Sequence, residues 1–343
     1  MHRRVTINQL AEACGLAKST VSIALREPES EIAAIRPDTR RRVLETAQKL
    51  GYRPSYRGRA LAANRSHCVG LIYARECYFQ GDFYQRVLSS CSAHLTARDY
   101  DLMLVPAVGD QDRWAPRLLD QRVDGCLVVQ PMPEGLEGVL RTERLPGVLI
   151  NLDADVDLPQ IRLDHRQALR LLFDHLVDLG HRHIAFAALH DSLHASKHYS
   201  DHEQREAYHE ARSTLTPDRP AHFLESSDPG DLMEQVQGAI DDGVTAVICK
   251  TDEAAMKVIR GLRDRGLVVP TDVSVVGSND SLASADFIPA ITTTRPPLDD
   301  LARLAVESLI DVLDGGLKID RRVTTLNWSL IQRESTSPPT ATR

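Results

Sequence analysis

Two hydrophobic periods divide the chain near Cys68. Before this point, apolar residues recur every three or four positions, which is the period of an amphipathic α-helix. After it, short apolar runs alternate with amphipathic stretches, a pattern typical of β-strands separated by α-helices. The pattern therefore predicts a small helical domain followed by an α/β body.

The first fifty residues predict three short helices. Thr6 and Gln9 have the spacing of a capping box, which opens the first helix. Gly15 can take the left-handed conformation that ends it, and a third helix is expected over 37–50, where Gly51 stops it. The residues expected to face the core are Ile7, Leu10 and Ala11 in the first helix, Ala17, Val21 and Leu25 in the second, and Val43, Ala47 and Leu50 in the third.

A tight glycine turn between two helices, closed by a third helix, is typical of a helix-turn-helix domain. The second helix carries short polar side chains and one cation near its start, namely Lys18, Ser19, Thr20 and Ser22. Such groups suit base edges and phosphates. The basic linker 55–66 follows, and its short helix would be marginal alone but could form once a polyanion neutralises its arginines.

The apolar runs of the body fall into two sets. The first is CVGLIYA, YDLMLVP, GCLVVQ and GVLINL, and the second is HIAFAAL, TAVICK and VSVVG. Each set predicts a parallel, doubly wound sheet. No GxGxxG or GxxxxGK[ST] follows a strand, and neither GxSxG nor HExxH occurs, so the sequence predicts no cofactor and no enzyme activity.

Charge and cysteines narrow the class further. Residues 1–67 carry 13 Lys and Arg against 6 Asp and Glu, whereas the remainder carries 28 against 42. A basic head on an acidic body suggests that the head binds a polyanion. The six cysteines are scattered without a CxxC pair, and no apolar run of a membrane span or secretory signal occurs, so we expect a reducing, cytoplasmic location.

Six blocks of sequence carry a family resemblance. They are VTINQLAEACGLAKSTVSIAL, RRRVLETAQKLGYRPS, HLVDLGHRHIAF, GLRDRGLVVPTDVSVVGSNDSLAS, PAITTTRPP and LIQREST. In this order and spacing they make the chain resemble the LacI/GalR family of bacterial transcription regulators over nearly its whole length.

The resemblance implies a three-part chain. An N-terminal three-helix helix-turn-helix head would occupy 1–54, a hinge helix 55–66, and a two-lobed, periplasmic-binding-protein-like core with two parallel doubly wound sheets 67–340. Within the core, the N-lobe would take about 67–162 and 293–320 and the C-lobe about 163–290 and 321–340, with crossing strands near 160–164, 288–295 and 318–323.

For the head, the resemblance implies that a homodimer binds a pseudo-palindromic double-stranded DNA operator. The second helix would lie in the major groove and the hinge helix in the minor groove, where Leu61 would wedge between base pairs and kink the duplex. The residues expected to contact DNA are Thr6, Lys18, Ser19, Thr20, Ser22, Ile23, Arg57 and Leu61.

The head departs from the family pattern in two places. Ile23 stands where the family usually has an arginine, the commonest bidentate reader of guanine, so we expect a shifted base preference with DNA binding retained. The segment 27–36 is longer than usual and carries three glutamates. It is expected to be a solvated loop directed away from DNA, with a contact for a partner protein as the alternative.

For the body, the resemblance implies a small-molecule effector, sugar-like or another polar metabolite, between the lobes. Four positions correspond to residues that anchor the ligand in the family. Asn151 and Asn279 replace carboxylates, Gln204 replaces an arginine, and Thr251 replaces an asparagine. The aspartate that follows this asparagine is kept as Asp252. The usual stacking aromatic falls near Asp228. Arg205 could replace the missing arginine only through a one-residue shift of register. The residues expected to bind the effector are Phe83, Tyr84, Asn151, Gln204, Thr251, Asp252 and Asn279.

Two interpretations of this site stay open. Amides both donate and accept hydrogen bonds, so they could meet an unusual effector. Alternatively, the site has lost regular ligand binding. Phe83 and Tyr84 are equally compatible with ordinary core aromatics.

Four histidines at four-residue spacing form a separate pattern, at His190, His194, His198 and His202. On a helix, neighbouring pairs could share a metal ion. The family has a loop here, which favours a polar, pH-sensitive loop, and we assign no metal site.

The leading hypothesis is a sequence-specific DNA-binding transcription regulator, a repressor as in most of the family. A solute-binding protein of the same core fold is the alternative, but it would need an export signal. An enzyme is the third class, and no set of nucleophile, base and orienting group is identifiable in the sequence.

Overall fold

The computed structural model describes most of the chain. The described residues are 5–25, 35–54, 65–73, 81–108, 110–129, 132–133, 135–190, 199–215, 220–315 and 321–340. The chain divides into a head, Met1–Ser66, and a body, His67–Arg343. Among the described residues, no helix is long and apolar enough to cross a membrane.

The head contains α1 (Ile7–Cys14), α2 (Lys18–Ala24) and α3 (Pro37–Leu50). The predicted capping box opens α1, because Gln9 N donates to Thr6 Oγ1 at 3.4 Å and Thr6 N donates to Gln9 Oε1 at 2.9 Å. Gly15 ends α1 in the left-handed conformation with a φ of 61°. Arg42 on α3 donates to the Cys14 carbonyl oxygen at 3.1 Å, which ties the third helix to the end of the first. The buried core consists of Leu10, Ala11, Cys14, Val21, Ala24, Val43 and Ala47.

Two residues expected in this core lie outside it. Ala17 is exposed because it is the N-cap of α2 and precedes the first helical turn, and Ala24 is buried on the core face instead. Leu50 is 40% exposed at the end of α3, and Tyr52 packs against the core in its place. The three predicted helices and the turn between them are otherwise confirmed.

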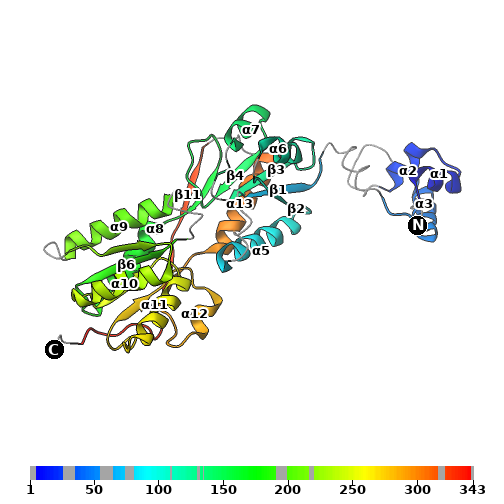
Figure 1. Cartoon of the computed structure of the whole chain (residues 1–343). Helices are drawn as coiled ribbons and strands as arrows, with labels where there is room; N and C mark the ends of the chain where they lie inside the picture. The colour runs from blue at the N-terminus through cyan, green and yellow to red at the C-terminus, as the bar shows by residue number, and fades with distance from the viewer. Residues whose placement is uncertain are drawn as a thin grey trace. The chain divides into compact units, whose positions relative to one another are not determined.

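The first lobe of the body is built on a six-stranded parallel sheet in the order β11-β5-β4-β3-β1-β2. Helices α5 and α13 pack on one face of the sheet, and α6 and α7 pack on the other (Figure 1). The strands are β1 (Cys68–Tyr73), β2 (Asp101–Pro106), β3 (Gly125–Val129), β4 (Gly147–Ile150), β5 (Gln160–Leu163) and β11 (Val323–Leu326). The helices are α5 (Asp82–Thr96), α6 (Gln111–Leu119), α7 (Leu136–Glu143) and α13 (Leu298–Leu313).

The second lobe has a four-stranded parallel sheet in the order β7-β6-β8-β9. Helices α8 and α9 cover one face, and α10 and α11 cover the other. The strands are β6 (Ile184–Leu189), β7 (Phe223–Ser226), β8 (Ala246–Cys249) and β9 (Ser274–Val276). The helices are α8 (His165–Asp178), α9 (Tyr199–Leu215), α10 (Pro229–Asp241), α11 (Asp252–Asp264) and the short α12 (Leu282–Asp286). Two doubly wound parallel sheets, as predicted, are therefore confirmed.

Three segments join the lobes. The first leads from β5 into α8, the second contains β10 (Thr293–Arg295), and the third contains β12 (Ser329–Ile331), which pairs antiparallel with β10. The sequence suggested that the chain enters the second lobe at residue 321. In the structure β11 pairs in parallel with β5, so the chain stays in the first lobe as far as Leu326. Gln167 on α8 holds this last crossing: Trp328 N donates to its Oε1 at 2.9 Å, and its Nε2 donates to the Trp328 carbonyl oxygen at 3.2 Å.

Gly277, directly after β9, lies against Asp252 at the start of α11. A Cβ atom on Gly277 would lie 2.2 Å from Asp252 Oδ1 and 3.1 Å from its Cα atom. Asp252 is fixed in turn, because its two oxygens accept hydrogen bonds from Thr293 Oγ1 and Ser281 N, each at 2.6 Å. Any side chain on residue 277 would therefore displace a buried, hydrogen-bonded carboxylate.

We predict that Gly277→Ala lowers the free energy of unfolding of the body by about 1–3 kcal/mol, the usual cost of overpacking. Urea unfolding followed by tryptophan fluorescence measures this in the full chain, since both tryptophans, Trp114 and Trp328, lie in the body. Gly238→Ala is the matched control: Gly238 lies within α10 and its Cβ would meet no heavy atom within 4 Å, so alanine should stabilise by up to about 1 kcal/mol. Equal effects of the two substitutions would contradict the packing argument.

Candidate DNA-binding and effector sites

The outer face of α2 is the candidate DNA-reading surface of the head. Successive helical residues are separated by about 100°, so Ser19 and Ile23 lie together, opposite the buried Val21 and Ala24. Lys18 and Ser19 are exposed, and Ile23 is half-buried. The face therefore presents a cation, hydroxyl groups and one branched apolar side chain.

The polar side chains of this face are free to make new contacts. Within the described part of the chain, Lys18, Ser19, Thr20 and Ser22 have no side-chain hydrogen bond or ion pair. Thr6 is exposed too, although its hydroxyl takes part in the capping box of α1. Arg57 and Leu61 of the linker lie outside the described residues, as does most of segment 27–36.

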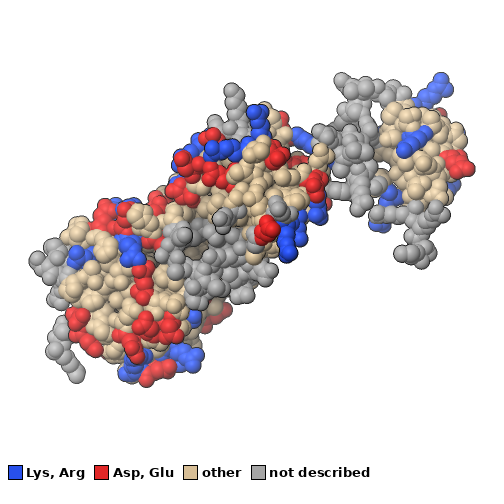
Figure 2. Space-filling model, turned by 45° about the horizontal axis from the view of Figure 1, so that its top comes forward, with Lys and Arg blue, Asp and Glu red and all other residues tan. Residues whose placement is uncertain are grey.

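Positive charge gathers on the head. Figure 2 shows more blue than red side chains on the head, whereas both colours are spread over the body. The described part of the head carries eight Lys and Arg against three Asp and Glu. The cations are Lys18, Arg36, Arg40, Arg41, Arg42, Lys49, Arg53 and Arg65.

Asn151 forms the centre of the candidate effector site. It follows β4 with a φ of 50°, a left-handed conformation that asparagine tolerates, and it is 3% exposed. Its Oδ1 accepts hydrogen bonds from Tyr199 Oη at 2.7 Å and from His165 Nε2 at 3.2 Å. Tyr199 begins α9 of the second lobe, so this hydrogen bond crosses between the lobes.

Burial fixes the protonation of both donors. It lowers the pKa of His165 to about 3, with a further contribution from the positive charge of Lys250, so the imidazole is neutral at pH 7. It also raises the pKa of Tyr199 above its ordinary value, so the phenol keeps its proton. Asn151 therefore receives two hydrogen bonds from uncharged groups.

The charged groups around Asn151 are paired within the protein. Lys250, directly after β8, forms an ion pair with Asp201 on α9. Arg162 on β5 forms an ion pair with Asp153, and its guanidinium carbon lies 5.9 Å from the centre of the Tyr199 ring. The site thus contains two ion pairs. Glu203 on α9 adds a third carboxylate beside Tyr199, and burial raises its pKa above the ordinary value.

Gln204 lies one helical turn beyond Asp201 on α9. It is 8% exposed, and its Oε1 has no hydrogen-bond partner among the described residues. Arg205 does not take its place: it pairs with Glu225 on β7, and its guanidinium carbon lies 4.3 Å from the centre of the Phe223 ring. The buried amide oxygen of Gln204 and Oε2 of the adjacent Glu203 are consequently two acceptors that the described residues leave unused.

The other expected effector residues have structural contacts of their own. Thr251 is the N-cap of α11 and accepts a hydrogen bond from Ala254 N at 3.2 Å, and Asp228 caps α10 in the same way. Asn279 has a φ of 101°, and its N–H donates to the Thr294 carbonyl oxygen at 2.9 Å. The expected role of these residues toward a ligand stays a prediction.

Phe83 and Tyr84 are half-buried at the start of α5 and pack against the core of the first lobe. Their rings meet edge to face with centres 5.0 Å apart. This packing accounts for both side chains as core aromatics, and it leaves the expected role as a ligand wall a prediction.

The described histidines of the four-residue series bind different glutamates. His190 Nε2 lies 3.1 Å from Glu225 Oε1, and His202 Nε2 lies 3.2 Å from Glu206 Oε1. His194 and His198 lie outside the described residues. Among the described residues, no group of three or more His, Cys, Asp or Glu side chains could hold a metal ion.

The sequence did not point to the residues that surround Asn151, namely Arg162, His165, Tyr199, Asp201 and Lys250. Lys250 had a usable signal, because a polar residue directly after a buried parallel strand lies at the edge where ligands bind such sheets. Tyr199 and Asp201 had none, since only the docking of α9 brings them to this edge.

Comparisons with known proteins extend over both units of the chain. The HTH-type transcriptional regulator RegA of Clostridium saccharobutylicum is 28% identical over 340 residues, which are 96% of this chain and 99% of that protein. Catabolite control protein A of Priestia megaterium is 27% identical over 342 residues, with 97% and 99% coverage. Residues 173–336 match the model of a periplasmic binding protein-like domain. These comparisons support the resemblance of the chain to the LacI/GalR family of bacterial transcription regulators.

Solved structures of LacI-type regulators share this fold. A lac repressor dimer bound to operator and the anti-inducer ONPF superposes with a TM-score of 0.80 at 21% identity, covering 98% of this chain and all of that one. A complex of the transcriptional regulator CelR with cellobiose gives a TM-score of 0.68 at 24% identity, with 97% and 100% coverage. These relatives are regulators and not enzymes, which agrees with the expectation from sequence.

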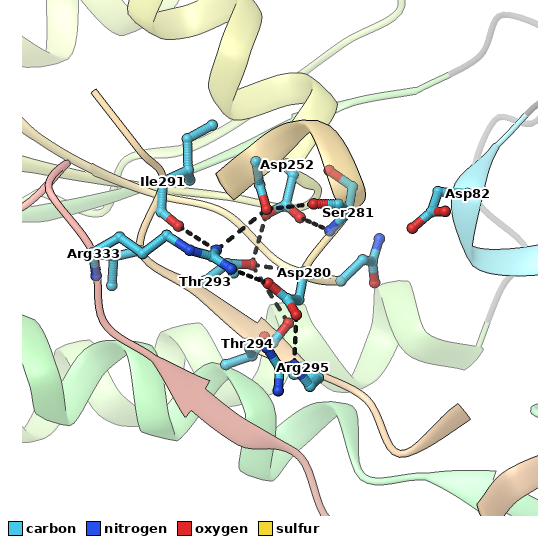
Figure 3. A network of polar contacts seen from close by, with 12 residues as sticks. Asp82, Asp252, Asp280, Ser281, Ile291, Thr293, Thr294, Arg295 and Arg333 are labelled. Atoms are coloured by element: carbon cyan, nitrogen blue, oxygen red, sulfur yellow. Dashed lines mark hydrogen bonds and ion pairs between the residues drawn. The ribbon is translucent and has the colours of Figure 1, made fainter. Parts of the chain in front are cut away.

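Asp252 is a buried carboxylic acid of the body whose pKa is strongly raised. Burial raises its pKa to about 6, even though the hydrogen bonds from Thr293 and Ser281 lower it (Figure 3). The pKa in the folded state is thus above the ordinary 3.8. The stability contributed by protonating Asp252 is complete below the ordinary pKa and is lost as the pH rises through about 6.

We therefore predict that the unfolding free energy of the wild type, relative to Asp252→Asn, falls by about 1 kcal/mol between pH 5 and about pH 7.5. Asparagine does not titrate, so it removes this dependence while adding a constant offset for its lost acceptor. Urea titrations of both proteins at several pH values measure the difference. Glu234→Gln, on an exposed position of α10, is the control and should leave the pH dependence unchanged. A pH-independent difference between wild type and Asp252→Asn would contradict the assignment.

Proposed function

We propose that this protein represses transcription by binding a pseudo-palindromic operator in double-stranded DNA as a homodimer, under the control of a small polar metabolite bound between its lobes. We expect it to act in the cytoplasm, without a cofactor. The observation that carries the proposal is the outer face of α2, where Lys18, Ser19, Thr20 and Ser22 are unpaired beside Ile23. A LacI-type chain needs such a face to read DNA.

The side chains near the N-terminus of α2 suit the role of a DNA-reading helix. A helix of this kind enters the major groove and contacts base edges with residues near its N-terminus. Lys18 supplies a cation for a phosphate, and the hydroxyl groups of Ser19, Thr20 and Ser22 can donate to or accept from base edges. The expected contacts of Arg57 and Leu61, in the linker, complete the proposed interface.

Exposed apolar side chains on the body support a homodimer. Leu282, the first residue of α12, is 78% exposed, and Ile288, two residues beyond this helix, is 87% exposed. Leu104 on the edge strand β2 is 42% exposed. Apolar groups at a sheet edge and on a short helix are what a two-fold interface would cover.

The proposed effector site is the cluster around Asn151, with Gln204 and Lys250 from the second lobe. The solved relative CelR carries cellobiose in its complex, which supports a small polar ligand for this chain too. A solute-binding protein is the weaker alternative, since the relatives RegA and catabolite control protein A align over both the head and the body.

The first test is the salt dependence of DNA binding. We predict that the full chain binds duplexes selected from a random pool, and that its affinity falls steeply with salt as phosphate counterions are released. Lys18→Ala should weaken binding to all sequences and reduce the slope of log affinity against log salt by about 1. Fluorescence anisotropy measures both quantities. Lys49→Ala removes an exposed cation at the end of α3 and should change neither, and salt-independent binding by the wild type would overturn the proposal.

The second test concerns Ile23. We predict that wild type and Ile23→Arg select half-sites that differ at one base pair, where the arginine variant prefers guanine by about 5- to 100-fold, the discrimination of one bidentate contact. Selection from a random duplex pool followed by sequencing measures the preference. Gln48→Arg adds the same charge on an exposed position of α3 and should leave the selected base unchanged. Identical half-sites for wild type and Ile23→Arg would remove Ile23 from the reading face.

A further inference from the structure

Two separate polar contacts bridge the lobes of the body. In the first, Arg86 on α5 of the first lobe donates from Nη1 to the carbonyl oxygens of Asn279 and Asp280, at 3.4 and 3.2 Å. Its Nη1 also lies 3.5 Å from Asp82 Oδ2, one helical turn earlier. Arg86 is thus held by its own lobe while it binds the backbone of the other.

The backbone that receives Arg86 is rigidly placed. Asn279 and Asp280 have φ values of 101° and 48°, so both are in the left-handed half of conformational space. The Asp280 carboxylate accepts from Arg333 Nη2 and from Arg295 Nε, each at 2.5 Å. Figure 3 shows this network, with Asp82 on α5 facing it from the first lobe. The two carbonyl oxygens are therefore presented to Arg86 in a fixed position.

The charge on Asp280 is secured by the same contacts. Burial alone would raise the pKa of Asp280, but the hydrogen bonds and charges of Arg333 and Arg295 outweigh it and hold the pKa below its ordinary value. Arg333 is itself anchored, because it donates to the Ile291 carbonyl oxygen at 2.9 Å. Asp280 therefore stays ionised at neutral pH and keeps both arginine partners, which hold the carbonyl oxygens of residues 279 and 280 in place for Arg86.

The second bridge is made by Tyr199 Oη, which donates to Asn151 Oδ1 at 2.7 Å and lies 3.3 Å from the Leu163 carbonyl oxygen on β5. His165, which begins α8, supports it with its own hydrogen bond to Asn151 and with an edge-to-face contact to the Tyr199 ring at 5.3 Å. The neighbouring cations, Lys250 and Arg162, are already paired with carboxylates of the protein. The groups that we assign to ligand binding are therefore largely satisfied by the chain itself.

We propose that these two bridges, Arg86 to residues 279–280 and Tyr199 to Asn151, form a latch that holds the lobes at this spacing without any small molecule. A ligand that needs Asn151 Oδ1 must displace Tyr199, and so it acts on the latch directly. This last step rests on the proposed function, whereas the latch itself does not. Removing one bridge should shift the ratio of latched to unlatched molecules by about tenfold, the effect of one net hydrogen bond.

Electron spin resonance distance measurement on the full chain, free of DNA and of small molecules, tests the latch. Spin labels on non-canonical residues at Glu143 of α7 and Glu234 of α10 report the lobe spacing, since both positions are exposed and lie in different lobes. Labelled chain is mixed with an excess of unlabelled chain, so that a labelled homodimer contains one labelled subunit, and we expect one narrow distance distribution for the wild type. Arg86→Met and Tyr199→Phe should each add a second, displaced population, and the double variant should increase it.

Two matched controls separate the latch from general damage. Arg98→Met removes an arginine whose partner, Glu307 on α13, lies in the same lobe at 3.3 Å. Tyr208→Phe removes a hydroxyl that binds the Ile184 carbonyl oxygen within the second lobe at 3.2 Å. Both should retain the wild-type distribution.

Unchanged distributions in Arg86→Met, Tyr199→Phe and the double variant would overturn the proposal, as would a broad distribution in the wild type. Tyr199→Phe retains the aromatic ring, so it keeps the test valid even if Arg86→Met unfolds. The measurement uses no DNA, so a displaced population together with absent DNA binding would refute the proposed function and leave the latch standing.

Discussion

The arrangement of the second lobe depends on the buried carboxylate of Asp252. It begins α11 with no exposed surface, and a charge there is tolerated because Ser281 N and Thr293 Oγ1 donate to its two oxygens. These donors come from the turn after β9 and from β10, so one carboxylate joins a helix start, a turn and a crossing segment. Gly277 is the complement of this arrangement, since only a residue without Cβ leaves room for it.

The position of the turn follows from this anchor. Each of the two donors to Asp252 is next in sequence to a residue that holds the turn 279–280. Asp280 precedes Ser281, and Thr294, whose carbonyl oxygen accepts from Asn279 N, follows Thr293. Fixing one side of the turn on Asp252 therefore orients Asp280 toward the two arginines and leaves its carbonyl oxygen directed at the first lobe. A fully buried carboxylate thus determines where the lobes can touch, because hydrogen bonds inside a protein interior are costly to leave unmade.

The sequence predicted what local rules control, and it failed where distant segments meet. The capping box at Thr6, the glycine turn and the alternation of strands and helices depend on neighbours within a few residues, and all three are present in the structure. Ala17 and Leu50 were misplaced because helix ends break the periodicity that assigned them. The strand β7 escaped notice, since a short, half-exposed edge strand has little apolar signal. Around the effector site, the bond between Tyr199 and Asn151 joins residues 48 positions apart, and no periodicity carries that information.

Charge balance would decide which molecules the effector site that we propose around Asn151 accepts. An aspartate in place of Asn151 would bury a negative charge beside the neutral imidazole of His165. Neither Arg162 nor Lys250 would be free to compensate this charge, because each is already paired with a carboxylate. The amide avoids this cost and still accepts two hydrogen bonds, which is why it can be buried to 3% exposure. A charged ligand would have to break the pair of Lys250 with Asp201 or of Arg162 with Asp153, whereas a neutral one needs only to replace the Tyr199 hydroxyl. If the anchor positions that the resemblance implies bind a ligand, the amides there and the internal ion pairs together would favour an uncharged, hydrogen-bonding molecule.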